Sequence, residues 1–167
     1  MDILHFNMEG IDYGCQLEDV DQILHMASIQ PIAHGPDFLA GMFNLGGKLL
    51  PVVDLCKMLG HSRDLPPPPT STHEEVLSPY KQDCRLILVK LAGCDPDDSQ
   101  APEKIIAVIL DGWQGLRETD QSEFQPCLVS DDERPDFIHN LSLSENKTMQ
   151  FIQLKYLLNA RQQSVLI

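Results

Sequence analysis

One stretch of the chain restricts its possible folds more than any other, namely residues 36–55. These twenty residues combine a proline-led turn, an apolar segment of helical appearance, a glycine pair and an apolar run of strand length. The run covers residues 47–54 and contains Pro51. Because proline cannot donate to the hydrogen-bond ladder of a sheet, Pro51 predicts a strand edge or a β-bulge at this point.

Alternation of apolar and polar residues predicts further strands on both sides of this stretch. A glycine turn at residues 9–12 lies between two alternating runs and predicts an antiparallel hairpin, whose apolar positions are Leu4, Phe6, Met8, Tyr13, Cys15 and Leu17. Further apolar runs predict strands at residues 20–26, 85–91, 104–110, 136–141 and 148–154. The second and third of these runs are continuous, which predicts strands buried on both faces. A polar turn region is expected at residues 140–147.

A weak internal repeat divides the chain into two similar halves. Residues 53–60 align with residues 152–159, and each copy is expected to be a strand followed by a short helix. The copies end in Gly60 and Asn159, two residue types that tolerate the left-handed helix cap. Residues 62–83 between the halves include four consecutive prolines, which predict an extended connector, or alternatively a proline-rich ligand for a docking domain. Many short strands in two halves predict two small β-barrels or a sandwich.

Composition excludes several classes of function. The formal net charge of −13 would repel a nucleic-acid phosphate surface. No apolar run approaches the roughly 18 residues of a membrane span, and the N-terminus lacks a basic signal-peptide region, so a cytoplasmic protein is expected. Five irregularly spaced cysteines and six histidines show no metal-ligand or disulfide pattern, so we expect neither metal nor cofactor.

Three features could indicate catalysis or binding, and each has a simpler structural interpretation. The glycines at 41, 46 and 47 lack the lysine and serine of a phosphate-binding loop, which favours turn glycines. The acidic run 131–133 is typical of a solvated turn, although a small β-barrel enzyme using these acids is an alternative. Trp113, the only tryptophan, is expected to pack in the core, with an exposed docking anchor as the alternative.

Residues 36–55 resemble the signature of the CheW-like domains, the coupling adaptors of bacterial chemosensory arrays. The family fragment reads F-V-x-G-V-x-N-L-R-G-x-V-x-P-V-V-D-L, and the chain departs from it mainly by Gly46 at the arginine position. Residues 20–23 lie where the family reads V-x-E-I, and residues 108–113 resemble its V-D-x-V strand. The resemblance is strong over residues 3–60 and weaker over residues 84–160.

The resemblance implies a mainly β fold of two small five-stranded SH3-like β-barrels, packed across a hydrophobic seam and accompanied by short helices. Residues 1–167 would form a single CheW-like domain. Its first barrel is expected at about residues 15–61, the proline-rich linker at 62–83, and the second barrel at about 84–160. The N-terminal strand within residues 1–14 is a candidate to complete the second barrel.

The resemblance also implies a non-enzymatic, cytoplasmic adaptor without a cofactor. Such an adaptor couples the tip of a methyl-accepting chemoreceptor to the regulatory domain of a CheA-type histidine kinase. The alternative is a divergent scaffold in a pilus, gliding or surface-sensing pathway. The family positions expected to bind partners are Val20, Gln22, Ile23, Gly41, Asn44, Gly46, Gly47, Pro51, Asp54 and Leu55.

Two departures from the family pattern belong together. Family members commonly carry glutamate at the position of Gln22 and arginine at the position of Gly46, and these two residues pair. Joint loss of both charges leaves no unpaired ion, so the fold is expected to survive it, at a loss of stability of about 0–1 kcal/mol. An arginine offers five hydrogen-bond donors and glycine offers none, so one interpretation is a partner surface that differs from that of an ordinary chemotaxis adaptor. The alternative is simple sequence drift at a tolerant surface site.

Overall fold

The computed structural model describes residues 2–61, 83–91, 104–118, 124–126, 138–144, 147–158 and 162. Their elements in chain order are β1 (Asp2–Met8), β2 (Ile11–Gln16), η1 (Leu17–Asp19), β3 (Val20–His25), β4 (Leu39–Leu45), β5 (Lys48–Asp54), α1 (Leu55–Met58), β6 (Arg85–Leu91), β7 (Lys104–Leu110), β8 (Trp113–Glu118), β9 (Phe124–Pro126), β10 (Ile138–Ser144), β11 (Lys147–Ile152) and η3 (Leu154–Tyr156). The proline run and the acidic residues 131–133 lie outside the described residues. Within the described ranges, no helix has the length and apolarity needed to cross a bilayer.

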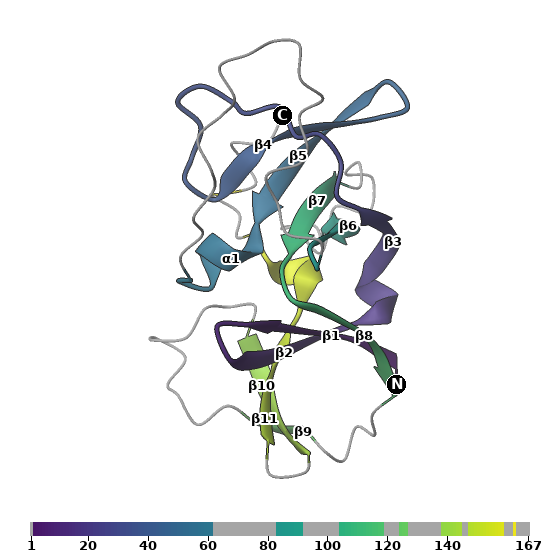
Figure 1. Ribbon diagram of the computed structural model, residues 1–167, viewed down its shortest axis with the longest axis vertical. Coiled ribbons are helices and arrows are strands. Elements are labelled where there is room, and N and C mark those ends of the chain that lie inside the picture. Colours follow the sequence, from purple (N-terminus) through teal and green to yellow (C-terminus); the bar gives the residue numbers. More distant parts are fainter. Residues whose placement is uncertain are drawn as a thin grey trace, which may run out of the picture.

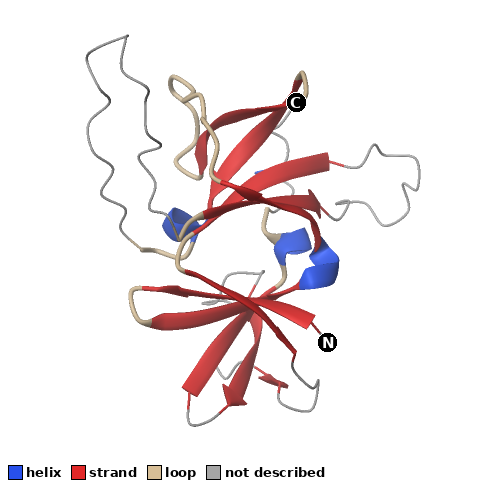
Figure 2. Cartoon of the chain, turned by 45° about the vertical axis from the view of Figure 1, so that its right-hand side comes forward, coloured by secondary structure: helices blue, strands red, loops and turns tan. Residues whose placement is uncertain are grey.

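The described strands form two sheets that face each other, with the short helices between them (Figures 1 and 2). One sheet has five strands in the order β3-β6-β7-β5-β4, and the other has six in the order β8-β1-β2-β11-β10-β9. The fold is therefore mainly β, as the sequence predicted, with β9 as an additional strand in the second sheet. Strands β8 and β9 were not expected from the sequence.

Strand membership differs from the expected division of the chain. β6 and β7 follow the connector in sequence and were expected in the second barrel, but they pair with β3 and β5 in the five-stranded sheet. β5 and β7 pair in parallel, an arrangement that needs a long crossover rather than a tight turn. The hairpin β1–β2 lies in the six-stranded sheet, where β2 pairs in parallel with β11. Distance along the chain was therefore a poor guide to sheet membership.

The segment of helical appearance before the glycine pair is a strand, so this expectation was wrong. β4 pairs in antiparallel register with β5, and the two are joined by the two-residue loop Gly46–Gly47. Both glycines have positive φ, at +58° and +93°, as the tight turn of a two-residue hairpin requires. The spacing of apolar residues within residues 39–45 suggested a helix, but pairing with β5 determines the conformation of this segment. That pairing cannot be seen from the segment alone.

Pro51 lies in an interior strand, yet its missing donor causes no gap in the sheet. β5 lies between β7 and β4, but its ladder with β7 begins only at Val52. Lys48 to Pro51 therefore pair with β4 alone, so this part of β5 behaves as an edge. The expected bulge is present on the partner strand, between Leu39 and Gly41.

The structure confirms the internal repeat of strand followed by short helix. β5 leads into α1 and β11 leads into η3. α1 ends as predicted, because Gly60 has a φ of +82° and its amide donates to the Lys57 carbonyl at 3.0 Å. The His61 amide donates to the Cys56 carbonyl at 2.9 Å, which completes a Schellman cap.

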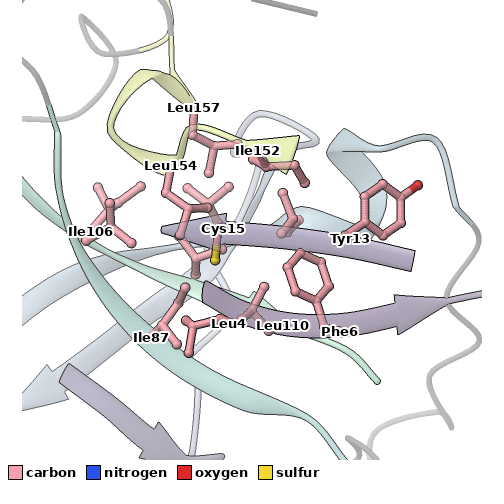
Figure 3. Close-up of a cluster of buried hydrophobic side chains, with 14 of the residues drawn as sticks. Leu4, Phe6, Tyr13, Cys15, Ile87, Ile106, Leu110, Ile152, Leu154 and Leu157 are labelled. Atoms are coloured by element: carbon pink, nitrogen blue, oxygen red, sulfur yellow. The ribbon is translucent and has the colours of Figure 1, made fainter. Parts of the chain in front are cut away.

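The two sheets share one hydrophobic core, which we call the seam cluster (Figure 3). The six-stranded sheet and η3 contribute Leu4, Phe6, Tyr13, Cys15, Ile152 and Leu154, and the five-stranded sheet with α1 contributes Val53, Leu55, Ile87, Val89, Ile106 and Val108. A second cluster lies within the five-stranded sheet and includes Phe43, Leu50, Leu86 and Leu88. Trp113 is half-buried against the seam cluster, in agreement with the packing role expected for it.

Candidate docking surface

β3 presents the first group of expected partner-binding residues. It lies at one end of the five-stranded order, where β6 is its neighbour, and much of it is exposed. Ile23 is 37% exposed and lies opposite Ile87 of the seam cluster, so it shares the sheet face that points toward the seam. Val20 is half-buried against that cluster, and Gln22 is exposed beside a register shift. An edge strand with an exposed isoleucine is a typical site for another protein to dock.

A charged pocket of about 280 Å³ adjoins the start of β3. Its lining comes from η1, β3, β6 and η3, and consists of Glu18, Asp19, Val20, Asp21, Lys90 and Lys155. Burial raises the pKa of the Asp19 carboxyl, and the neighbouring Lys155 partly offsets this rise. One carboxylate oxygen of Asp19, Oδ2, is buried without a hydrogen-bond partner among the described residues. The pocket therefore places partly desolvated charge beside the exposed strand.

The hairpin β4–β5 presents the second group. Asn44, Gly46 and Gly47 are all exposed, and Asn44 Oδ1 accepts the Gly47 amide at 2.8 Å. A Cβ atom at Gly46 would meet no atom within 4 Å, and the residue is exposed, so the position of the family arginine is open to solvent. Leu49 on the same hairpin is 59% exposed.

Sequence reasoning missed Leu49 as a candidate contact residue. Leu49 pairs with Asn44, whereas its neighbour Leu50 pairs with the buried Phe43. Successive strand residues point to opposite faces, so only one of the two adjacent leucines can face the core. Strict period-two counting from Val52, which is buried, would have placed Leu50 inside and Leu49 outside.

Three of the expected partner-binding residues are buried and serve the fold. Leu55 is fully buried in the seam cluster, and Asp54 Oδ1 accepts the Lys57 amide at 3.4 Å as the N-cap of α1. Gly41 is buried because the backbone of Gln30 passes directly over it. Gly41 was expected to be a turn glycine, but it lies within β4, where its missing side chain leaves room for a backbone of the same chain.

The approach of Gln30 also connects the two ends of the five-stranded sheet. Gln30 and Met42 exchange two backbone hydrogen bonds of 2.9 and 2.8 Å. The segment that follows β3 is thereby joined to β4, the strand at the other end of the order. Pro51, directly opposite Met42, is half-buried on this hairpin. The exposed members of the expected set are therefore carried by two elements of one sheet.

Asp54 also belongs to a group of possible metal ligands. One ligand atom from each of Asp54, Cys56 and Asp111 lies within 4.8 Å of the others. The Asp54 carboxylate already accepts the Lys57 amide, a bond that orients it as a helix cap. We assign this carboxylate to the N-terminal cap of α1.

The chain is thus a small two-sheet module, built around one shared seam, with an exposed edge strand and hairpin. The chain belongs to the CheW-like domain family, whose sequence pattern matches residues 2–162.

Two individual proteins illustrate the similarity. The chemotaxis protein CheW of Thermotoga maritima is 29% identical over 63 residues, which is 38% of this chain and 42% of that protein. The match thus spans less than half of the curated relative. The crystal structure of the scaffolding protein TtCheW from Thermoanaerobacter tengcongensis superimposes with a TM-score of 0.72 at 22% identity, covering 96% of this chain and 89% of that one. This likeness shows the shared fold.

The missing Glu–Arg pair yields a prediction about Gln22 and Gly46. β3 and β4 lie at opposite ends of the strand order, so no strand pairing places Gln22 beside Gly46, and their proximity is a prediction of the family pairing alone. On that basis we expect Gln22→Glu with Gly46→Arg to be tolerated better than Gly46→Arg alone, with a favourable coupling of about 0.5–1 kcal/mol for an exposed pair. The positive φ of Gly46 adds a cost of about 1 kcal/mol to both variants, and a double-mutant cycle of unfolding free energies cancels this shared cost. Zero coupling would show that the two losses are unrelated.

Proposed function

We propose that this chain is a cytoplasmic, non-enzymatic adaptor that couples the tip of a methyl-accepting chemoreceptor to the regulatory domain of a CheA-type histidine kinase. The observation that carries the proposal is that family signature positions on β3 and on the β4–β5 hairpin are exposed, while the remaining signature positions build the fold beneath them. Exposed residues at recognition positions on a packed sheet are what a docking protein needs, because little ordering is required on binding.

The chemistry of the exposed positions supports a particular mode of docking. Ile23 and Leu49 offer apolar contact area. Gln22 and Gly46 replace the glutamate and the arginine of the family pair, so neither charge is present. Recognition at this surface therefore depends on apolar burial and on polar groups other than that pair, including the charged pocket beside β3. We infer that the matching receptor surface contributes an apolar contact where a receptor of an ordinary adaptor meets the arginine.

A second candidate is a divergent scaffold in a pilus, gliding or surface-sensing array. The same two departures at Gln22 and Gly46 favour it, because a receptor of another pathway would present a different contact surface. The two candidates share the adaptor mechanism and differ in the receptor. Binding measured against receptor tips of both kinds distinguishes them.

The test uses two isoleucines of equal exposure. Ile23 on β3 and Ile11 on β2 are each 37% exposed, so replacing either with aspartate removes the same apolar area and adds the same charge. We expect Ile23→Asp to weaken binding to the receptor tip at least about tenfold, which corresponds to about 1.4 kcal/mol. We expect Ile11→Asp to change it less than about twofold, because Ile11 lies on the other sheet.

Biolayer interferometry against purified receptor tip and kinase regulatory domain provides the affinities, and thermal melting provides the stability control. Similar melting temperatures with a loss of affinity only in Ile23→Asp would support the proposed surface. Equal affinities in the two variants would exclude β3 from docking. Failure of the unmodified chain to bind either partner, or any alternative receptor tip, would overturn the proposed function itself.

A further inference from the structure

Three polar side chains form a continuous hydrogen-bonded chain across one end of the seam. The Tyr13 hydroxyl lies 2.7 Å from His61 Nε2, and His61 Nδ1 lies 2.7 Å from Glu9 Oε2. Glu9 and Tyr13 belong to the β1–β2 hairpin of the six-stranded sheet, whereas His61 follows α1, which extends from β5 of the other sheet. The three side chains therefore join the two sheets by polar contact, beside the apolar seam cluster.

The surroundings assign the protons of this chain. Burial raises the pKa of the Tyr13 phenol, and the neighbouring Cys56 and Glu9 raise it further. A carboxylate can only accept, so the 2.7 Å contact with Glu9 Oε2 places a proton on His61 Nδ1. The other nitrogen of the neutral imidazole, Nε2, then accepts from the Tyr13 hydroxyl, which keeps its proton at neutral pH. Each of the three groups then has a defined hydrogen-bond role.

Each member is held in place by its own element. His61 is the residue whose amide completes the Schellman cap of α1, and its side chain is only 8% exposed. Tyr13 is 3% exposed and stacks on Phe6 with ring centroids 5.5 Å apart (Figure 3). Figure 3 shows the Tyr13 hydroxyl directed away from the other labelled side chains. Glu9 occupies the hairpin turn with a φ of +52°. The His61 and Tyr13 side chains have little freedom left to lose, so the bond between them stabilises the folded state more than one between exposed, flexible groups would.

We propose that Glu9, His61 and Tyr13 form a latch that controls local opening of the two sheets at this end of the seam. The inference concerns the fold alone and does not depend on which partners the chain binds. Cys56 on α1 is 4% exposed, belongs to the seam cluster, and is one of the neighbours that raise the pKa of the Tyr13 phenol. Opening of the latch exposes this thiol, whereas Cys84, also buried, lies outside the seam cluster. Both are reduced thiols.

The two thiols allow opening to be measured directly. The native chain is labelled with iodoacetamide, and peptide mass spectrometry gives the labelling rate of each cysteine. If the chain recloses faster than it is labelled, this rate is proportional to the population in which that cysteine is accessible. Tyr13→Phe removes one hydroxyl, and we expect it to label Cys56 about fivefold faster, the change that corresponds to a net hydrogen bond of about 1 kcal/mol. Tyr156→Phe is the matched control, since Tyr156 is 45% exposed and outside the latch.

The outcomes separate a latch from general destabilisation. The latch is supported if Tyr13→Phe raises the labelling rate of Cys56 and leaves that of Cys84 unchanged, while Tyr156→Phe changes neither rate. Equal acceleration of both cysteines, or no acceleration of Cys56, overturns it.

Two further readouts keep the proposal testable if Tyr13→Phe folds poorly. Glu9→Gln alters a side chain that is 57% exposed, and it should accelerate labelling of Cys56 by about twofold or more. Long-range proton–nitrogen NMR of the unmodified chain should place the proton of neutral His61 on Nδ1. A proton on Nε2 would contradict the hydrogen-bond directions on which the latch depends.

Discussion

Replacing Gly41 with alanine is expected to lower the free energy of unfolding by about 3 kcal/mol or more. Losses of this size are typical when buried backbone donors and acceptors are left without partners. A Cβ atom at Gly41 would collide with the carbonyl oxygen of Gln30, and would also lie 2.8 Å from its carbonyl carbon and 2.9 Å from Ile29 Cγ2. Relief requires the Gln30 backbone to move away, which breaks the two hydrogen bonds between Gln30 and Met42. Urea denaturation followed by circular dichroism measures the change.

Gly46→Ala is the control for this prediction. Gly46 has a φ of +58° and open space around it, so alanine there adds only the cost of a left-handed conformation, about 1 kcal/mol. A similar loss of stability in both variants would show that the contact with Gln30 is unimportant. If Gly41→Ala is the more damaging, as expected, any larger side chain at Gly41 would disrupt the sheet as well, so substitutions at this position cannot test docking.

Leu55→Ala and Leu154→Ala are each expected to lower the free energy of unfolding by about 2–5 kcal/mol, as deletion of fully buried leucine side chains usually does. Both leucines are completely buried, and each begins the short helix that follows the strand of its repeat copy. They come from opposite sides of the seam and enter one cluster. Each substitution should therefore shift a single cooperative transition of the whole chain.

Leu49→Ala supplies the comparison, because Leu49 is 59% exposed and its truncation should cost no more than about 0.5 kcal/mol. Fluorescence of Trp113 and far-ultraviolet circular dichroism should report the same midpoint in each variant. Two separate midpoints would mean that the sheets unfold independently, and the seam would then not be a shared core.

Local pattern was sufficient to predict the elements whose signals lie within a few residues. The alternation around the turn at Gly10 predicted the β1–β2 hairpin, and Gly60 correctly predicted the end of α1. The apolar runs 85–91 and 104–110 coincide with β6 and β7. The assignment of these strands to a sheet could not be predicted in the same way, because parallel pairing with β5 joins residues some fifty positions apart in the sequence.

The signature residues show a similar limit for the docking surface. A motif records which residue types occur together, but it does not distinguish residues that support the fold from residues that meet a partner. Gly41, Asp54 and Leu55 support the fold here, whereas Gln22 and Ile23 are exposed. The exposure of Leu49 was predictable in principle from strand alternation, but the close approach of Gln30 to Gly41 required the three-dimensional structure.

The strand order has a consequence for synthesis of the chain on the ribosome. All strands of the five-stranded sheet lie between Val20 and Leu110, whereas the strands of the other sheet flank this interval on both sides. Among the described elements, β1 and β2 are made early, yet β1 meets its partner β8 only once Glu118 is made, and β2 meets β11 only once Ile152 is made. Both outer edges of this hairpin are therefore still unpaired when synthesis reaches Leu110, where the last strand of the five-stranded sheet ends.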